Sequence, residues 1–195
     1  MSAAKAYKLF RRAKGGGLRP LYVLSSEEIP LGVWLPAKRG PLSGDGAHVA
    51  SRLGPLAFRP GWHLCELPLA DHIGRRAPDG SGRLLQAPDT VWAEVEYGTD
   101  ADYGPEAGPR GLPKVPEGGF YRFRTNPKAK VGWIIAGEIR VLRALSAEEV
   151  ADACRAAGLE PQPVWPGEPV DPDPGKGYNK GEEGRSAEKE EKHAL

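Results

Sequence analysis

Three residues of one short segment carry side chains that can bind a metal ion. His63 and Cys65 are two positions apart, so they share one face of an extended strand, and His72 follows Cys65 after six intervening residues. Zinc takes four protein ligands at structural sites and three at catalytic sites, so a distant His48 or an acid such as Asp71 would have to complete the set. We therefore predict histidines that hydrogen-bond or face solvent, and no metal site.

Cys65 is also the candidate nucleophile of this segment, with His63 or His72 as its base. Nothing in the sequence indicates a third group that orients the histidine or a thiol with a lowered pKa, so we interpret Cys65 as a packing residue. Cys65 and Cys154 fall on a predicted strand and a predicted helix, which favours two buried thiols over a disulfide.

A second group of side chains favours binding rather than catalysis. Arg122 and Arg124 share one face of a predicted strand, Asn126 extends the polar side at the following turn, and Arg140 joins from a later strand. Two or three guanidinium groups on one sheet face can hold phosphates or an acidic protein surface. The alternative is that they form the solvent face of a half-buried hairpin.

The familiar catalytic and nucleotide-binding motifs are absent from the sequence. It contains no phosphate-binding loop, no dinucleotide fingerprint after a strand, no nucleophile elbow, no zinc-protease motif and no paired CxxC. Function has to be inferred from weaker signals.

Composition and charge indicate one domain with long connections. The chain has 195 residues, of which 39% are hydrophobic, and it contains 26 glycines and 20 prolines. Residues 160–195 carry nine acids and five bases, which leaves 22 bases and 17 acids on the rest. The part of the chain before residue 160 is therefore mildly basic. This charge is consistent with an anionic partner, or with a solvent-exposed surface of mixed charge. With no apolar run near the length of a membrane span, we expect a cytoplasmic protein and no membrane partner.

Hydrophobic patterning predicts a mainly antiparallel sheet. The predicted strands are residues 6–11, 21–24, 29–35, 62–67, 91–97, 120–124 and 131–142. The last two form a hairpin, and its long second strand lies in the sheet interior, with Gly137 permitting a bulge or bend. A short helix is predicted after Pro68, running through Ile73 and ending at Gly74.

The most clearly marked helix follows the hairpin. Ser146 and Glu149 form a capping box, an apolar stripe at helical spacing follows, and Gly158 occupies the C-cap position. The fold class is therefore α+β, with about five to seven strands, long loops and a C-terminal helix that covers the sheet. Residues 1–159 form a single domain and 160–195 a Pro-rich strap and disordered tail, in which Trp165 is the expected anchor.

An ordered set of segments resembles a family of uncharacterised small proteins encoded by tailed phages and prophages. The segments are KLFRR, LGVW, FRPGWHL, PLADHIG, PDTVWAEVE, GGFYRFRTNP and GWIIAGEIRVLR. The resemblance covers most of residues 6–145. It implies a phage accessory or host-interaction role and assigns no catalytic residue.

A second resemblance, in the layout of these segments, is to ADP-ribosyltransferase domains, which split NAD. It implies that Arg11 grips phosphate, Trp62 stacks on the ligand, His63 takes the second-motif position and Glu138 is the catalytic acid. The family's acid precedes the apolar run, whereas Glu138 follows it, and His63 replaces a hydroxyl residue. A degenerate relative that only binds NAD therefore stays open.

The sequence thus leads to two hypotheses. The first is a phage-type accessory binding module for a protein or another anionic partner, nucleotide or nucleic acid included, with no cofactor. The second is an ADP-ribosyltransferase-like enzyme, or its degenerate relative, with NAD as the ligand.

Overall fold

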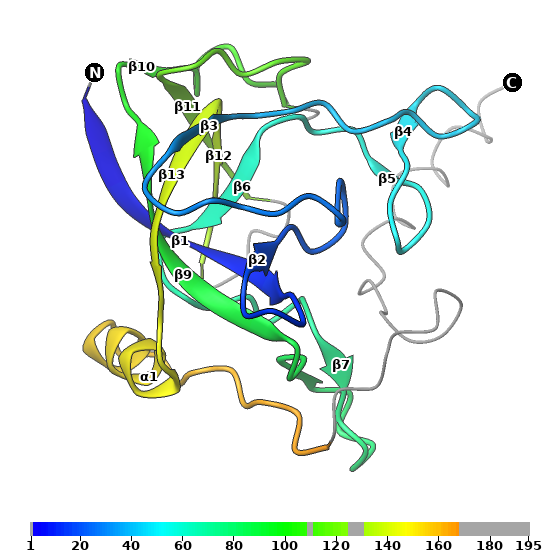
Figure 1. Cartoon of the computed structure of the whole chain (residues 1–195), viewed down its shortest axis with the longest axis vertical. Helices are drawn as coiled ribbons and strands as arrows, with labels where there is room; N and C mark the ends of the chain where they lie inside the picture. Colours follow the sequence, from blue (N-terminus) through cyan, green and yellow to red (C-terminus); the bar gives the residue numbers. More distant parts are fainter. Residues whose placement is uncertain (1, 109–110, 125–130, 168–195) are drawn as a thin grey trace, which may run out of the picture.

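The computed structural model describes residues 2–108, 111–124 and 131–167, and it consists mainly of one strongly curved sheet (Figure 1). The strands of this sheet are β1 (Ala3–Arg12), β2 (Leu18–Arg19), β3 (Trp34–Pro36), β6 (Trp62–Cys65), β9 (Thr90–Gly98), β10 (Ala101–Asp102), β11 (Gly119–Phe123), β12 (Trp133–Ala136) and β13 (Glu138–Ala144). Two further pairs stand apart: β4 (His48–Val49) with β5 (Leu56–Ala57), and β7 (Arg75–Arg76) with β8 (Leu84–Leu85).

The order of the large sheet is β10-β11-β12-β6-β1-β9-β13-β3, and β2 pairs with β1. All neighbours are antiparallel except β10 and β11, which are parallel. The long strands β1 and β9 form its centre and pair continuously from Ala3↔Gly98 to Arg11↔Thr90. In both strands apolar residues recur at every second position along one face, which is the pattern of a strand with a buried side.

Gly137 alone separates β12 from β13, yet the two strands occupy distant places in the sheet. β12 pairs with β6 and β11, whereas β13 pairs with β9 and β3. Because β12 and β13 follow each other directly in the chain, the sheet must curl so that these two distant strand positions come close together. A side chain at Gly137 would overlap the carbonyl of Pro116, which explains why glycine stands at the crossing.

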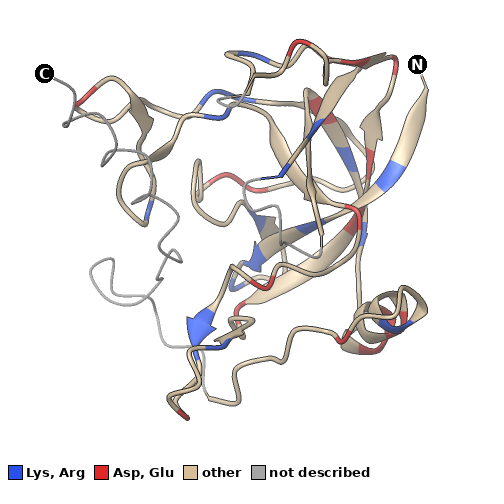
Figure 2. Cartoon of the chain, turned by 180° about the vertical axis from the view of Figure 1, so that it is seen from behind, with Lys and Arg blue, Asp and Glu red and all other residues tan. Residues whose placement is uncertain are grey.

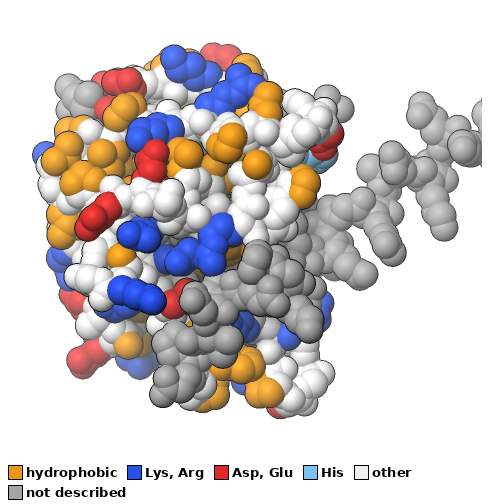
Figure 3. Space-filling model, turned by 45° about the vertical axis from the view of Figure 1, so that its right-hand side comes forward, with side chains coloured by type: hydrophobic (Ala, Val, Ile, Leu, Met, Phe, Trp, Pro, Cys, Tyr) orange, Lys and Arg blue, Asp and Glu red, His pale blue; other side chains and the backbone are white. Residues whose placement is uncertain are grey.

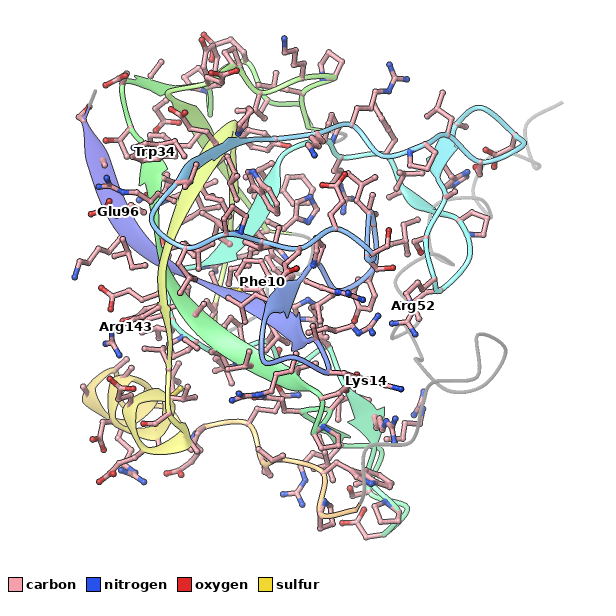
Figure 4. All side chains as sticks on the ribbon, viewed as in Figure 1. Phe10, Lys14, Trp34, Arg52, Glu96 and Arg143 are labelled. Carbon is pink, nitrogen blue, oxygen red and sulfur yellow. The ribbon has the colours of Figure 1, made fainter. Side chains whose placement is uncertain are left out.

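The curl encloses the main core. Its members are all apolar and come from most of the long strands; they include Phe10, Leu64, Val95, Ile134, Ile139 and Val141. Phe10 projects from β1 into the space between the strands (Figure 4). The opposite face of β1 and β9 carries a second cluster, built around Leu9, Trp92 and Leu145. Both faces of the sheet are therefore covered at this end.

The predicted C-terminal helix is confirmed as α1 (Ala147–Ala156). Ser146 Oγ accepts from the N–H of Glu149 at 3.1 Å, and the Glu149 carboxylate accepts from the N–H of Ser146 at 2.8 Å. Gly158 adopts a φ of 71°, a value that favours glycine after a helix end. This ten-residue helix is the sole one in the described part of the chain, and it is too short to cross a membrane.

The pairing of the predicted hairpin is confirmed, since β11 and β12 pair from Phe120↔Ala136 to Phe123↔Trp133. Its second strand, predicted as one strand over residues 131–142, is corrected, because it is divided at Gly137 into β12 and β13, which are not neighbours in the sheet. The strand count is corrected, because the sheet has nine strands rather than five to seven. Several additional strands span only two residues, too few to leave a periodic signal in the sequence.

Three predicted elements differ from the structure. The strand predicted at residues 29–35 is reduced to β3 (Trp34–Pro36), because residues 31–33 form bends. Pro68 is followed by turns rather than a helix, with the N–H of Leu69 bonded to Leu67 and that of Ile73 to Ala70. The segment is too short to repay the cost of a helical nucleus, and its side chains bury locally instead. Residues 21–24 form turns instead of a strand, and Leu24 has a positive φ of 53°.

The first part of the predicted strap packs on the domain (Figure 1). The Gln162 side-chain amide donates to the carbonyls of Ile73 at 2.8 Å and Leu84 at 3.2 Å. The N–H of Trp165 donates to the carbonyl of Gln86 at 2.9 Å, so Trp165 is held beside β8. The expected disorder of the tail concerns residues 168–195, which lie outside the described residues.

Candidate functional site

The candidate site is a cavity of about 350 Å³ beside the junction of β1 and β6. These two strands share a single paired position, Tyr7↔Cys65, so they separate beyond it. The segment 20–61 covers the opening from one side, and β9, β11 and β12 also contribute to the walls. This volume lies within the range of cavities that bind small molecules.

The cavity walls are mainly apolar and aromatic. The aromatic side chains that line it are Tyr22, Phe58, Trp62, Trp92, Phe123 and Trp133. Trp62 is fixed by a hydrogen bond from its indole N–H to the carbonyl of Leu35 at 2.9 Å. Trp92 is 2% exposed, and its indole N–H has no partner among the described residues. Rigid rings of this kind favour flat apolar ligands.

Lys8 brings an amine to this apolar wall. Its Nζ donates to the carbonyl of His63 at 3.0 Å and lies 5.5 Å and 5.3 Å from the ring centroids of Phe10 and Trp62. No carboxylate of the described residues pairs with it. Burial lowers the pKa of Lys8 to about 8, although the nearby Cys65 acts in the opposite direction. About half of the amine is therefore neutral near pH 8.

His63 is held in its neutral form. Burial lowers its pKa to about 4, the hydrogen bond with the Arg59 carbonyl opposes this, and the charges of Lys8 and Arg59 add to the lowering. Its Nε2 lies 2.9 Å from the Arg59 carbonyl oxygen. A carbonyl only accepts, so Nε2 carries the proton and Nδ1 keeps its lone pair.

Cys65 is a poor nucleophile in this setting, because burial raises the pKa of its thiol to about 12. His72 lies edge-on to Trp133 at 4.9 Å between ring centroids, and its Nδ1 is 3.6 Å from Asp71. Within the described ranges, no group of three or more histidines, cysteines and acids could hold a metal ion. His63, Cys65 and His72 nevertheless all line the cavity.

Arg59 adds a cationic group to the cavity wall. Its guanidinium lies 4.4 Å from the ring centroid of Phe123, which also lines the cavity. At the rim, the ammonium of Lys38 is paired with Glu27 at 2.8 Å. The charge that faces the cavity is therefore mildly positive.

The structure does not bring Arg11, His63 and Glu138 together. Arg11 pairs with Thr90 at one end of β9, whereas Ile139, which follows Glu138, pairs with Tyr97 at the other end. Seven strand positions correspond to about 23 Å. Of the three, His63 alone lines the cavity.

Glu138 has a structural partner. Its side chain is 3% exposed, and Oε1 accepts from the N–H of Gly118 at 2.8 Å. Arg11 Nε lies 3.7 Å from Asp89 Oδ2, next to the start of β9. Each of the two residues is thus engaged with a different loop.

The predicted basic face is largely paired with acids. Arg122 Nε lies 3.1 Å from Glu66, and Arg140 forms two hydrogen bonds with Glu96 while stacking over Trp34. Trp34 and Glu96 lie close together on the outer side of the sheet (Figure 4).

The remaining members of that face are less informative. Arg124 is exposed, and Asn126 lies outside the described residues. Basic and acidic positions are also interspersed on the ribbon seen from behind, without a large region of one sign (Figure 2).

Sequence reasoning missed Lys8, Arg59 and Trp92 as parts of the site. For Lys8 the signal was present, since Ala6 and Phe10 stand two positions to either side and both are buried. Period-two alternation then places Lys8 on the inner face with them. Comparison with protein-family models, with curated proteins and with solved structures finds no match for this chain.

Proposed function

We propose that this protein is a binding module for a small, largely apolar molecule that carries a hydrogen-bond acceptor. The ligand would occupy the cavity between β1, β6 and the segment 20–61. The resemblance to phage-encoded proteins is the basis for proposing an accessory role. The cavity is the basis for proposing that this role involves binding a small molecule.

The observation that carries this proposal is the place of Lys8 in the cavity wall. An ammonium group has three N–H donors, and one of them donates to the carbonyl of His63. The other two have no acceptor among the described residues. Lys8 is only partly exposed, so its remaining donors have little water around them, and a ligand oxygen that accepts from Lys8 gains more than it would in water.

The surroundings of Lys8 define the rest of the ligand. Trp62 and Trp133 offer flat faces, and Leu9, Leu21 and Ile73 offer aliphatic wall. Burial of apolar surface contributes about 25 cal/mol per Å². The polar end of the ligand would be neutral or anionic, because Lys8 and Arg59 both repel a cation.

An anionic partner on the outer surface has weaker support. Arg11, Arg122 and Arg140 each have an acidic neighbour, so their charge is already balanced. On the face drawn in Figure 3, basic side chains are spread among apolar and acidic ones. An NAD-splitting reaction has weaker support too, because Arg11 and Glu138 lie at opposite ends of β9.

Calorimetric titration with three probes of similar size tests the proposal. Benzyl alcohol and benzoate present an oxygen acceptor, whereas benzylamine presents a cation. We expect the first two to bind and benzylamine to bind at least about tenfold more weakly, which corresponds to about 1.4 kcal/mol. Equal affinity for all three, or no binding of any, contradicts the proposal.

A matched pair of variants locates the binding. Leu21 lines the cavity, so Leu21→Trp fills part of it and should abolish benzyl alcohol binding. Leu42 is 42% exposed and does not line the cavity, so Leu42→Trp should leave binding unchanged.

A further inference from the structure

We propose that Lys8 is a reactive amine that captures a carbonyl ligand of the cavity as an imine. This inference rests on the proposed function, because it assumes that the cavity admits a small apolar molecule. It adds a covalent step and a substrate class: an aldehyde or ketone attached to a flat apolar group.

The position of Lys8 favours this chemistry over a salt bridge. Its Nζ is fixed by the carbonyl of His63 and lies over the rings of Phe10 and Trp62. None of the acids in the described ranges pairs with it. The amine is thus held at the wall of an apolar cavity with nothing that stabilises its charge fully.

Lys5, three residues earlier on β1, shows the contrast. Its ammonium is exposed and pairs with Glu94. The hydrogen bond with Glu94 is the larger cause, and the charge of Glu94 the second, of a pKa raised above the ordinary value for lysine. Burial instead lowers the pKa of Lys8 to about 8. Only a neutral amine attacks a carbonyl carbon, so Lys8 is the more reactive of the two near pH 8.

The groups that share the cavity with Lys8 do not reverse this difference. They are His63 and Cys65 of β6, Arg59 before it, His72 after it, and the Glu27–Lys38 pair at the rim. His63 is neutral and Cys65 is a thiol at pH 8, because their pKa values lie near 4 and 12. Arg59 is cationic, which also disfavours the charged amine.

The reaction balances without any further reagent. The lone pair of Nζ forms a bond with the carbonyl carbon, and the carbonyl oxygen takes up the proton that nitrogen loses. The resulting hydroxyl then leaves as water, with the second amine proton, while the carbon–nitrogen double bond forms. The products are one imine and one water molecule, no electron is gained or lost, and hydrolysis reverses the step.

The test uses benzaldehyde as the probe and cyanoborohydride to reduce any imine to a stable amine. After incubation of the full chain at pH 8, peptide mapping should place the fastest side-chain benzyl label on Lys8, and the same mapping separates it from the label on the α-amine, which is also largely neutral at this pH. The neutral fraction of Lys8 exceeds that of an ordinary lysine by roughly two orders of magnitude at this pH, so labelling should be at least about tenfold faster than at Lys5.

Two variants and one competitor sharpen the result. Lys8→Arg keeps the positive charge but has no primary amine, and it should lose the fast label. Lys5→Arg should keep that label. Benzyl alcohol has the same ring but no carbonyl, so it should slow the labelling of Lys8 in proportion to its occupancy of the cavity.

The outcomes separate this inference from the proposed function. Benzyl alcohol binding without fast labelling of Lys8 overturns the imine and leaves the binding module standing. Labelling spread evenly over the exposed lysines also overturns it, and mapping of the unaltered protein gives this answer even if Lys8→Arg fails to fold. No benzyl alcohol binding and no fast labelling overturn both.

Discussion

The carboxylate of Glu138 accepts a hydrogen bond from the backbone N–H of Gly118 inside the protein, at 2.8 Å. The bond joins the first residue of β13 to the end of the long connection before β11. A residue that resembles a catalytic acid in its sequence context is thus the partner of an otherwise unsatisfied buried donor.

Replacement of Glu138 tests this structural role. Glu138→Ala leaves the N–H of Gly118 unpaired, and we expect a loss of about 1–3 kcal/mol in the free energy of unfolding, measured with urea. Glu138→Gln keeps an acceptor oxygen and should lose less. Equal losses in the two variants would show that the hydrogen bond is not what matters.

Gly137 offers a steric test of the crossing between β12 and β13. A Cβ at this position would overlap the carbonyl of Pro116, so Gly137→Ala should cost about 3 kcal/mol or more. Gly44 has open space around it and no positive φ, so Gly44→Ala should change the unfolding free energy by less than about 0.5 kcal/mol. Thermal unfolding of both variants measures the difference. Similar unfolding midpoints would contradict the close approach of Gly137 to the carbonyl of Pro116.

His63 predicts a pH dependence of stability with a definite sign. Its pKa is about 6.5 in an unfolded chain and about 4 in the folded protein. Between these values the unfolded state binds more protons, so stability is lost as the pH falls from 6.5 to 4. The loss should be about 1–3 kcal/mol, since His63 is partly exposed.

The control for this pH dependence is His63→Gln, which does not titrate and can still donate to the Arg59 carbonyl. Urea unfolding at several pH values should show a smaller loss for the variant in this window. Parallel curves for the two proteins would rule out His63 as the cause.

Gln162 predicts that the strap contributes to stability. Gln162→Ala removes two hydrogen bonds and leaves the carbonyls of Ile73 and Leu84 without this partner. We expect a loss of about 1–2 kcal/mol in denaturant unfolding. Glu160 is exposed, so Glu160→Ala should have little effect, and an equal loss from both changes contradicts the docking.

The arginines of β11 distinguish the cavity from the outer surface as the binding site. Arg122→Ala combined with Arg124→Ala should leave the affinity for benzyl alcohol unchanged, because neither residue lines the cavity. Titration at low and high salt should also agree, since the ligand is neutral. A tenfold loss of affinity in the double variant would indicate that the ligand binds at the arginines of β11 and not in the cavity.

Local signals predicted the local parts of the fold. The alternation of residues 91–97 gave β9, and the spacing of Ser146 and Glu149 gave the start of α1, because each pattern depends on neighbours in the chain. The segment after Pro68 failed because tertiary burial outweighs its short helical pattern. That segment is also shorter than α1 and lacks the capping box that marks the start of α1.

The site was harder to predict for the same reason. His63 and Trp62 were identified from the sequence, whereas Lys8, on the predicted strand 6–11, was not among the candidate site residues. A strand pattern states which residues share a face, and when both faces are covered it does not state which face encloses the core. The direction of Lys8 is set by pairing with β6 and β9, which are distant in the chain.

The crossing at Gly137 has a consequence during synthesis. β1 is made first, but β12 and β13, which complete the sheet on either side of its centre, are made about 130 residues later. A nascent chain cannot close the curl until nearly all of the domain has left the ribosome. Folding should then be slow for the size of the domain and exposed to aggregation, so chaperones that shield unpaired strand edges should raise its yield more than a lower temperature does.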